Sequence, residues 1–312
     1  MTTHVNADNF VRAETDRMFH DLQQSAGGVN RFSHNREPAA IDKQTVIRLN
    51  RDTLYSFAVV DVSAGASLTL PEHGERYLSA MVVDEDHYVD AIFHDPGRYE
   101  LAAQQFGTPY VVVAVRTLVD PADPDDIAAV AAIQDRITLL GNSATPFVSP
   151  DYDAASLDET RDALLSLARN LTGFDHMFGT KEEVDPVRHL IGTAAGWGGL
   201  PTSEASYIGV DPRLPVGQYE LTVTDVPVDG FWSISVYNAK GFFEPNDRGA
   251  YTVNNITGMP NPDGSITIRF GDYPTDVPNA IPITEGWNYL VRLYRPRAEI
   301  RDGSWSFPRL TP

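Results

Sequence analysis

Apolar residues recur along the chain with two kinds of spacing, one typical of helices and the other of strands. Over Ala7–Ser25 they follow steps near three and four residues, which predicts an amphipathic helix that the pair Gly27–Gly28 ends. The apolar residues of this helix are Phe10, Val11, Met18, Phe19 and Leu22. The chain therefore begins with a helix before any strand.

Residues 45–117 are rich in β-branched and aromatic residues, arranged in short runs between turn-forming sequences. Strands this close together must be antiparallel, because a parallel pair needs a crossover of about a dozen residues. The predicted strands are Leu54–Val62, Tyr77–Val83, Tyr88–Phe93 and Tyr110–Val115.

The pattern turns helical after residue 120. Asp123 can cap a helix that starts at Pro124 and extends to about Leu140. Two further helices are predicted over Leu157–Leu171 and, after Asp185 and Pro186, over Val187–Ala195.

Strand patterns return in the last third of the chain, with a strong hairpin turn at 261–264. The predicted strands are Ala205–Val210, Tyr219–Val223, Phe231–Tyr237, Ala250–Val253, Ser265–Arg269 and Tyr289–Tyr294. We therefore predict a mainly β (α+β) fold: two antiparallel β-sandwich or jelly-roll-like domains, a helical insertion between them and an N-terminal helix. The expected parts are residues 1–40 (helix and arm), 41–120 (first β domain), 121–195 (helical insertion) and 196–312 (second β domain).

Composition narrows the possible partners. A hydrophobic fraction of 42% is that of a globular protein, and a net charge of -19 argues against nucleic acid or an anionic membrane. The chain has no cysteine, which excludes disulfides, thiolate metal sites and a cysteine nucleophile. Neither a secretory signal nor a membrane-spanning run is visible, since the longest apolar run is Val111–Val115. We expect a cytoplasmic protein.

Several well-known catalytic motifs are missing from the sequence. It contains no Gly-x-Ser-x-Gly elbow, no phosphate loop, no dinucleotide-binding Gly-x-Gly-x-x-Gly and no His-Glu-x-x-His. An ordinary α/β-hydrolase, a kinase, a Rossmann dehydrogenase and a zincin are therefore disfavoured, and we predict no cofactor.

The motif NRDTLYS at residues 50–56 carries unusual polarity for the start of a strand. Alternation places Arg51 and Tyr55 on one face, and Asn50 and Asp52 on the other. The guanidinium of Arg51 suits a carboxylate or phosphate of a ligand, or else it pairs with an Asp carboxylate that fixes the strand entrance.

The segment DEDHY at residues 84–88 places three carboxylates beside an imidazole. Carboxylates raise the pKa of a neighbouring histidine, so His87 is a candidate proton carrier with Asp84 beside it. The same two side chains could ligate a divalent cation, and a solvated acidic turn is a third interpretation.

Glycines surround Trp197 in the sequence AGWGGLP at residues 195–201, which indicates that another group approaches the backbone closely. That group is either a packed side chain or a ligand. The aromatic residues of the second β region, Trp232 among them, are spaced as a sandwich core or as a ligand-facing wall.

Together these motifs resemble bacterial proteins that pair two families of unknown function, numbered twelve-fifty-four and twelve-fourteen. The first is matched by NRDTLYS, Leu68–Pro71 and the stretch from Arg76 to Tyr88. The second is matched by AGWGGLP, DGFWS at 229–233, Asn288–Tyr294 and DGSW at 302–305. The resemblance implies two mainly β, sandwich-like domains with a helical insertion and a tendency to oligomerise. It supplies no catalytic residues.

Our leading hypothesis is an enzyme of hydrolase or lyase type that acts on a small organic or carbohydrate-like substrate by general acid–base catalysis. In this hypothesis His87 carries protons, Asp84 or Asp52 orients it, Arg51 binds an anionic group and Tyr55 donates a hydrogen bond. The predicted ligand contacts are Asn50, Trp197, Trp232 and Tyr207.

Two alternatives remain open. The protein could be a non-catalytic β-sandwich that binds a sugar or another small ligand, or a metal-dependent enzyme with an ion near Asp84 and His87. In each case we expect a small-molecule partner and a homo-oligomer, with no nucleic-acid or membrane partner.

Overall fold

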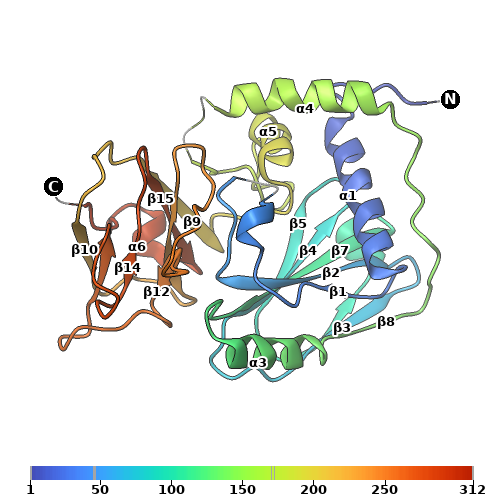
Figure 1. The fold of residues 1–312 in the computed structure, drawn as a ribbon. Coiled ribbons are helices and arrows are strands. Elements are labelled where there is room, and N and C mark those ends of the chain that lie inside the picture. The colour runs from blue at the N-terminus through green and yellow to red at the C-terminus, as the bar shows by residue number, and fades with distance from the viewer. Residues whose placement is uncertain (1, 45–46, 170, 172, 311–312) are drawn as a thin grey trace. The chain divides into compact units, whose positions relative to one another are not determined.

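A computed structural model describes residues 2–44, 47–169, 171 and 173–310 (Figure 1). Strands make up 28% and helices 21% of the fold, and most strands pair in antiparallel sheets. The described residues include six α-helices, the first of them close to the N-terminus. The mainly β class with a helical part, predicted from the sequence, is confirmed.

Two compact units make up the chain, and each draws on several stretches of sequence. Unit 1 consists of the residues up to Arg36 with Leu54–Leu118 and Ala128–Thr202. Unit 2 consists of Glu37–Thr53, Val119–Ile127 and the residues from Ser203 onward. The four parts predicted from the sequence follow one another along the chain, whereas these units interleave.

Unit 1 contains two antiparallel sheets that share an apolar core. The five-stranded sheet has the order β1 (Ser33–His34), β2 (Thr53–Asp61), β7 (Tyr110–Leu118), β4 (Leu78–Asp84) and β5 (Val89–Phe93). The three-stranded sheet has the order β6 (Gly97–Leu101), β3 (Ala66–Leu70) and β8 (Thr138–Gly141). Val60, Leu68 and Val113, all fully buried, belong to the shared core. All residues of β4 are buried, so this strand holds its terminal Asp84 in apolar surroundings.

The helices of unit 1 include α1 (Phe10–Ala26), α2 (Ala103–Phe106), α4 (Ala154–Ala168) and α5 (Pro186–Gly196). In Figure 1, α1, α4 and α5 lie together beside the five-stranded sheet, and their apolar faces form one cluster that includes Phe10, Leu164 and Ile191. Helix α4 ends at Ala168, whereas the helix predicted from the sequence extends to Leu171; residue 170 lies outside the described residues.

The helix predicted to reach Leu140 is shorter than expected. Helix α3 (Pro124–Gln134) ends before β8, in which Leu139 pairs opposite Leu68 of β3. Pairing in the sheet overrides the helical spacing of the apolar residues, because the neighbouring strand satisfies the backbone of these residues.

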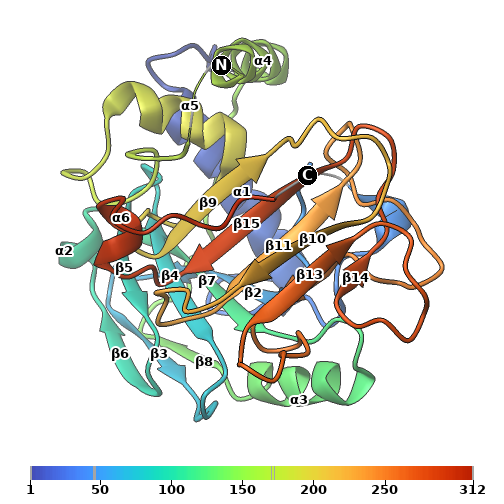
Figure 2. The same ribbon diagram turned by 90° about the vertical axis from the view of Figure 1, so that its left-hand side faces the viewer.

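Unit 2 also has two sheets (Figure 2). The four-stranded sheet has the order β12 (Thr252–Asn254), β11 (Trp232–Tyr237), β15 (Asn288–Tyr294) and β9 (Ala205–Val210). The other has the order β10 (Tyr219–Val223), β13 (Ile266–Phe270) and β14 (Ala280–Ile281). Strand β14 was not predicted, and it pairs in parallel with β13. A 3₁₀ turn (Ile41–Lys43) and a short helix, α6 (Ala298–Arg301), complete the unit.

Both faces of β11 are buried, but only one of them is apolar. Ile234 and Val236 face the core that the two sheets of unit 2 share, whereas Ser233, Ser235 and Tyr237 alternate onto the opposite, polar face. Burying polar groups destabilises the fold unless they are hydrogen-bonded. The hydrogen-bond partners of this face are therefore candidates for a functional site.

None of the helices in the described ranges is both long and apolar enough to cross a lipid bilayer.

Candidate functional site

The candidate residues predicted from the sequence fall into two groups, one in each unit. Asp84, His87, Trp197 and Tyr55 belong to unit 1. Asn50, Arg51, Asp52, Tyr207 and Trp232 belong to unit 2.

The tight turn between β4 and β5 shapes the first group. Asp84 fixes this turn, because its Oδ1 accepts hydrogen bonds from the backbone N–H groups of Asp86 (2.9 Å) and Tyr88 (2.8 Å). The strand register skips Asp90, since Val82 pairs with Ala91 and Val83 pairs with Val89. Asp90 is therefore the extra residue of a β-bulge, a feature that redirects side chains and is frequent beside active sites.

His87 is completely buried, with both ring nitrogens engaged. Its Nε2 accepts the backbone N–H of Gly198 at 2.8 Å, and its Nδ1 lies 2.8 Å from the Thr193 hydroxyl. That hydroxyl donates to the carbonyl of His189 at 2.9 Å, so Nδ1–H must donate to it and the ring is neutral. Burial, with a contribution from the His189 ring, lowers the pKa of His87 well below its usual value.

The geometry therefore contradicts the expectation that His87 carries protons. A proton carrier needs a nitrogen that the substrate or solvent can reach, and His87 has 0% exposure. The prediction is wrong because His87 is adjacent to the carboxylates in the chain, but they contribute nothing to its pKa shift. Burial dominates instead, and it disfavours the charged imidazolium.

The glycine-rich motif around Trp197 is a packing device in unit 1. The indole of Trp197 stacks on His87 with ring centroids 5.3 Å apart, and its Nε1 donates to the Thr15 hydroxyl at 3.1 Å. A side chain at Gly199 would lie 2.3 Å from the ring of Phe178. The group that approaches this backbone closely is therefore a packed side chain, and the indole itself lies between His87 and α1.

The pKa of Asp84 is shifted as well. Burial raises the pKa of Asp84 to about 7, against the backbone hydrogen bonds from Tyr88 and Asp86, and the charge of Asp90 adds to the rise. Among the described residues, no hydrogen bond engages the second oxygen of Asp84. Burial, with the charge of Glu182, raises the pKa of Asp90 to about 6. Two carboxyls on one hairpin therefore titrate near neutrality.

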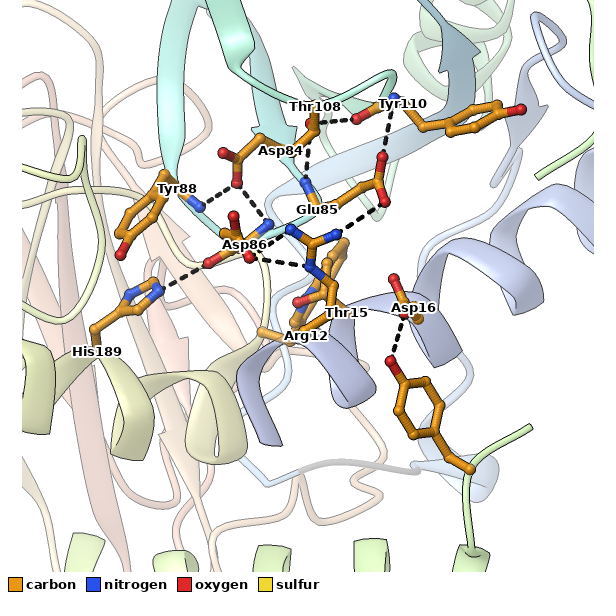
Figure 3. A network of polar contacts seen from close by, with 12 residues as sticks. Arg12, Thr15, Asp16, Asp84, Glu85, Asp86, Tyr88, Thr108, Tyr110 and His189 are labelled. Atoms are coloured by element: carbon orange, nitrogen blue, oxygen red, sulfur yellow. Dashed lines mark hydrogen bonds and ion pairs between the residues drawn. The ribbon is translucent and has the colours of Figure 1, made fainter. Parts of the chain in front are cut away.

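Arg12 ties α1 to the same hairpin (Figure 3). Its guanidinium contacts Asp86 at 2.6 Å and Glu85 at 3.2 Å. Figure 3 also shows the Asp84 carboxylate beside Tyr88, whose ring stacks on His189 with centroids 4.9 Å apart. The three acidic residues of this turn therefore differ in their partners. Glu85 and Asp86 form ion pairs with Arg12, whereas Asp84 forms no ion pair within the described parts of the chain.

Tyr55 lies elsewhere in unit 1, on β2. Its ring stacks on Phe57 with centroids 5.6 Å apart, and the guanidinium of Arg116 lies 5.4 Å from its centroid. Arg116 also donates to the carbonyl of Gly198 at 2.7 Å. A cation over the ring gives Tyr55 a structural reason for its place.

The second group is a buried polar network in unit 2. Arg292 donates to the Ser235 hydroxyl at 2.8 Å, Ser235 donates to Thr252 at 3.3 Å, and Thr252 donates to Asp52 Oδ1 at 3.0 Å. Asn254 also donates to Asp52 Oδ1, at 3.3 Å. Two hydroxyls therefore connect a buried guanidinium to a buried carboxylate. The other oxygen of Asp52 has no hydrogen-bond partner in the described parts of the chain.

Asn50 and Arg51 lie at the border of this network. Asn50 donates to the Tyr294 hydroxyl at 3.1 Å, and Arg51 lies 5.6 Å from the ring centroid of Tyr251 and donates to the carbonyl of Ala39. Burial lowers the pKa of Arg51. No Arg51–carboxylate ion pair occurs among the described residues, so the simple strand-entrance pair is wrong.

Trp232 and Tyr207 both pack against aromatic residues of unit 2. Trp232 is 4% exposed and packs edge-on against Phe307 in the core of unit 2. Tyr207, on β9, packs against the cluster of Tyr237 and Phe243. The predicted ligand contact at Trp232 is therefore wrong, because the apolar face of β11 is the core face.

Sequence reasoning missed Asp90, Ser235, Thr252 and Arg292 as candidates. A signal existed for Arg292, since a charged residue inside the apolar strand 288–294 requires a buried partner. The role of Asp90 had no such signal, because it depends on a bulge in the strand register.

No group of three His, Asp or Glu side chains in the described residues is arranged to hold a metal ion. The metal interpretation of Asp84 and His87 fails on geometry as well, because the His87 nitrogens are both engaged.

Residues 29–98 match a family described as "Protein of unknown function (DUF1254)", and residues 214–298 match "Protein of unknown function (DUF1214)". The pairing predicted from the motifs is confirmed, with the two segments in the expected order. The comparison with curated proteins gives no match.

Two solved structures have similar folds. The VPA0106 protein from Vibrio parahaemolyticus is 18% identical with a TM-score of 0.73, and the likeness covers 98% of both chains. A putative uncharacterized protein from Burkholderia cenocepacia is 14% identical with a TM-score of 0.52, over 97% of this chain and 86% of the other. At these identities the likeness concerns the fold alone.

Proposed function

We propose that the protein is an enzyme of hydrolase or lyase type that acts on a small organic or carbohydrate-like substrate by general acid–base catalysis. The proton-exchanging groups in this proposal are the carboxyls of Asp84 and Asp90. The observation that carries it is the placement of both groups on one bulged hairpin, with pKa values raised to about 7 and about 6.

Acid–base catalysis is most efficient when the pKa of the catalytic group is near the working pH. An ordinary aspartate is almost fully ionised at neutral pH and is therefore a poor acid. Asp84 exists in both protonation states there, and Asp90 is the more acidic of the two. Two carboxyls with separated pKa values are the usual arrangement for one acid and one base.

The remaining groups of the hairpin support this pair. Asp84 is only 4% exposed, and its Oδ1 accepts hydrogen bonds from two backbone N–H groups, so in this proposal the proton is exchanged at Oδ2. His87 and Trp197 act as positioning residues, since they fix the turn from its buried side. His189 has no role in substrate binding in this proposal, because its two ring nitrogens already contact the backbone carbonyls of Met177 and Asp86.

The test is a substrate screen over hydrolase and lyase reactions with the wild type, Asp84→Asn and Asp90→Asn. We expect each substitution to reduce kcat by about 100-fold or more, and the pH profile of kcat/KM to show apparent pKa values of about 6 and about 7. Asp95→Asn is the matched control, because Asp95 is an exposed carboxylate of the same unit. Full activity in correctly folded Asp84→Asn protein would contradict the proposal.

Two further expectations remain part of the proposal. An acidic chain without cysteine suits the reducing cytoplasm.

Exposed apolar residues on unit 1 helices, Leu167 at 56% and Val187 at 64%, support a homo-oligomer. Light scattering on the purified protein decides the second expectation, and a monomer at micromolar concentration would exclude it.

A further inference from the structure

The N-terminal helix of unit 1 carries an arginine whose contacts lead to the proposed acid–base hairpin. Arg12 lies in the first turn of α1, and all three nitrogens of its guanidinium bond the turn between β4 and β5 (Figure 3). Nε and Nη2 donate to Asp86 Oδ1 at 2.9 and 2.6 Å, and Nη1 donates to Glu85 Oε2 at 3.2 Å. A planar guanidinium bonded in this way fixes the direction as well as the distance of its partners.

Arg12 bonds the hairpin although its own helix offers a carboxylate. Asp16 is four residues further along α1, a spacing at which an aspartate and an arginine can pair. Tyr152 instead donates to Asp16 Oδ2 at 2.8 Å, and the buried Asp16 Oδ1 has no hydrogen-bond partner in the described parts of the chain. The contact of Arg12 with the hairpin is therefore favoured over a pair within the helix.

One partner of Arg12 is itself fixed to the sheet. Glu85 is 7% exposed, and its Oε1 accepts the backbone N–H of Tyr110 at 3.1 Å, at the start of β7. Because Arg12 bonds Glu85 and Asp86 together, it fixes the position of Asp86 relative to this strand.

Asp86 connects Arg12 to the proposed proton-exchanging group. Its side chain accepts from Arg12, while its backbone N–H donates to Asp84 Oδ1 at 2.9 Å. The next residue, His87, has a left-handed backbone with a φ of 65°, which is uncommon for residues other than glycine. Such a conformation persists only where the surrounding contacts hold it. Arg12 supplies one of these contacts from α1.

We propose that Arg12 is a positioning residue for Asp84 and acts through Asp86. The guanidinium holds the Asp86 backbone where its N–H bonds Asp84 Oδ1, and it neutralises the Asp86 carboxylate. The inference rests on the proposed function, in which Asp84 exchanges protons, and it gives α1 a part in the active site.

The loss of Arg12 should raise the pKa of Asp84 further. The N–H of Asp86 stabilises the Asp84 carboxylate, whereas the negative charge of Asp86 destabilises it. Without Arg12 that N–H is held less firmly and that charge is no longer neutralised, so both changes favour protonated Asp84. A turn that merely lost its order would expose Asp84 to water, and its pKa would then fall toward 3.8. The charged groups around Arg12 are Asp86, Glu85 and Asp16, and those around Asp84 are Asp90 and Asp86.

The experiment combines a ¹³C NMR titration of Asp84 with kinetics on a substrate found in the screen. In Arg12→Gln protein we expect the Asp84 midpoint to rise from about 7 to above about 7.5. We expect kcat to fall about tenfold and KM to change less than about twofold, because a misplaced carboxyl slows the chemical step. Arg12→Lys keeps the charge without the planar fork and should give intermediate values.

Arg17→Gln is the matched control. Arg17 lies on the same helix with a similarly exposed side chain, 40% against 37% for Arg12, but it pairs with Glu14 and Asp21. Its substitution should leave the Asp84 midpoint unchanged.

A double substitution tests the path through Asp86. In Asp86→Ala protein, Arg12→Gln should shift the Asp84 midpoint by less than about half as much as in the wild type, because the side chain that Arg12 bonds is already gone. Equal shifts in the two backgrounds would overturn the inference.

An Asp84 midpoint that stays at about 7 in Arg12→Gln protein, or falls toward 3.8, would also overturn it. The titration needs no substrate, so a screen without turnover contradicts the acid–base proposal while the role of Arg12 is still measured. If Asp84→Asn abolishes activity but Arg12→Gln changes neither kcat nor the midpoint, only the inference about Arg12 fails.

Discussion

At the scale of single residues, burial moves the pKa values of Asp84 and His87 in opposite directions. The two residues share one turn, yet the carboxyl titrates near neutrality and the imidazole well below it. The cause is the same for both, since a low-polarity environment disfavours whichever form is charged. The residue types of DEDHY were readable from the sequence. Their burial was not, because it depends on Thr193, Trp197 and other residues far along the chain.

We predict that His87→Ala destabilises the protein by about 2–4 kcal/mol, because it leaves a cavity beside Trp197 and removes the hydrogen-bond partner of Gly198 N–H. Urea unfolding followed by circular dichroism measures this loss. His20→Ala is the control, since His20 is exposed on α1 and should change the stability by less than about 0.5 kcal/mol. A change that small in His87→Ala would contradict the structural role.

At the scale of elements, the sequence predicted most of the long apolar strands but missed β3, although its residues Ala66–Leu70 alternate, and the more polar β6. It failed where pairing partners decide the structure. Residues 138–141 have helical spacing but form β8 opposite β3, and the two-residue β14 is too short to carry a pattern. The polar face of β11 was visible as Ser233 and Ser235, although its partner Arg292 becomes apparent only from the strand register.

The glycines of AGWGGLP give a prediction at this scale. A Cβ at Gly199 would lie 2.3 Å from the Phe178 ring, and that ring is 6% exposed and contacts His87. Gly199→Ala should therefore destabilise by about 1–3 kcal/mol through overpacking. At Gly196, the last residue of α5, a Cβ would be 3.7 Å from the nearest atom.

Gly196→Ala is the matched control for Gly199→Ala. It should be neutral or stabilise by up to about 1 kcal/mol, because alanine loses less backbone entropy than glycine in a helix. Differential scanning calorimetry of both variants tests the pair. Equal melting temperatures would show that the motif does not hold Phe178 by close packing.

At the scale of the whole molecule, the class of fold followed from the order of patterns along the chain. A solved structure with only 18% identity has the same fold over 98% of both chains, as expected when spacing rather than residue identity specifies the core. The interleaving of the two units could not be predicted, because it depends on long-range strand pairing that short windows of sequence do not contain.

The raised carboxyl pKa values predict how stability changes with pH. Between the unfolded value of 3.8 and the folded value of about 7, the folded protein holds a proton on Asp84 that the unfolded chain has lost. The free energy of unfolding therefore decreases as pH rises through this window, and Asp90 acts in the same direction up to about pH 6. The lowered pKa of Glu14 acts oppositely below its ordinary 4.5.

We expect the free energy of unfolding to be about 2–4 kcal/mol lower at about pH 8 than at about pH 5, since one pKa unit corresponds to about 1.4 kcal/mol. Urea unfolding at a series of pH values measures the curve. Asp84→Asn should flatten most of its alkaline side. A stability that rises from pH 5 to pH 8 would contradict the assigned burial of these carboxyls.

The most direct test of the central claim is the titration of individual aspartates by ¹³C NMR of the carboxyl groups. Asp84→Asn and Asp90→Asn spectra assign the two resonances. The account predicts midpoints of about 7 for Asp84 and about 6 for Asp90. Midpoints for both groups close to the ordinary value of 3.8 would contradict it, because neither carboxyl could then exchange protons at neutral pH.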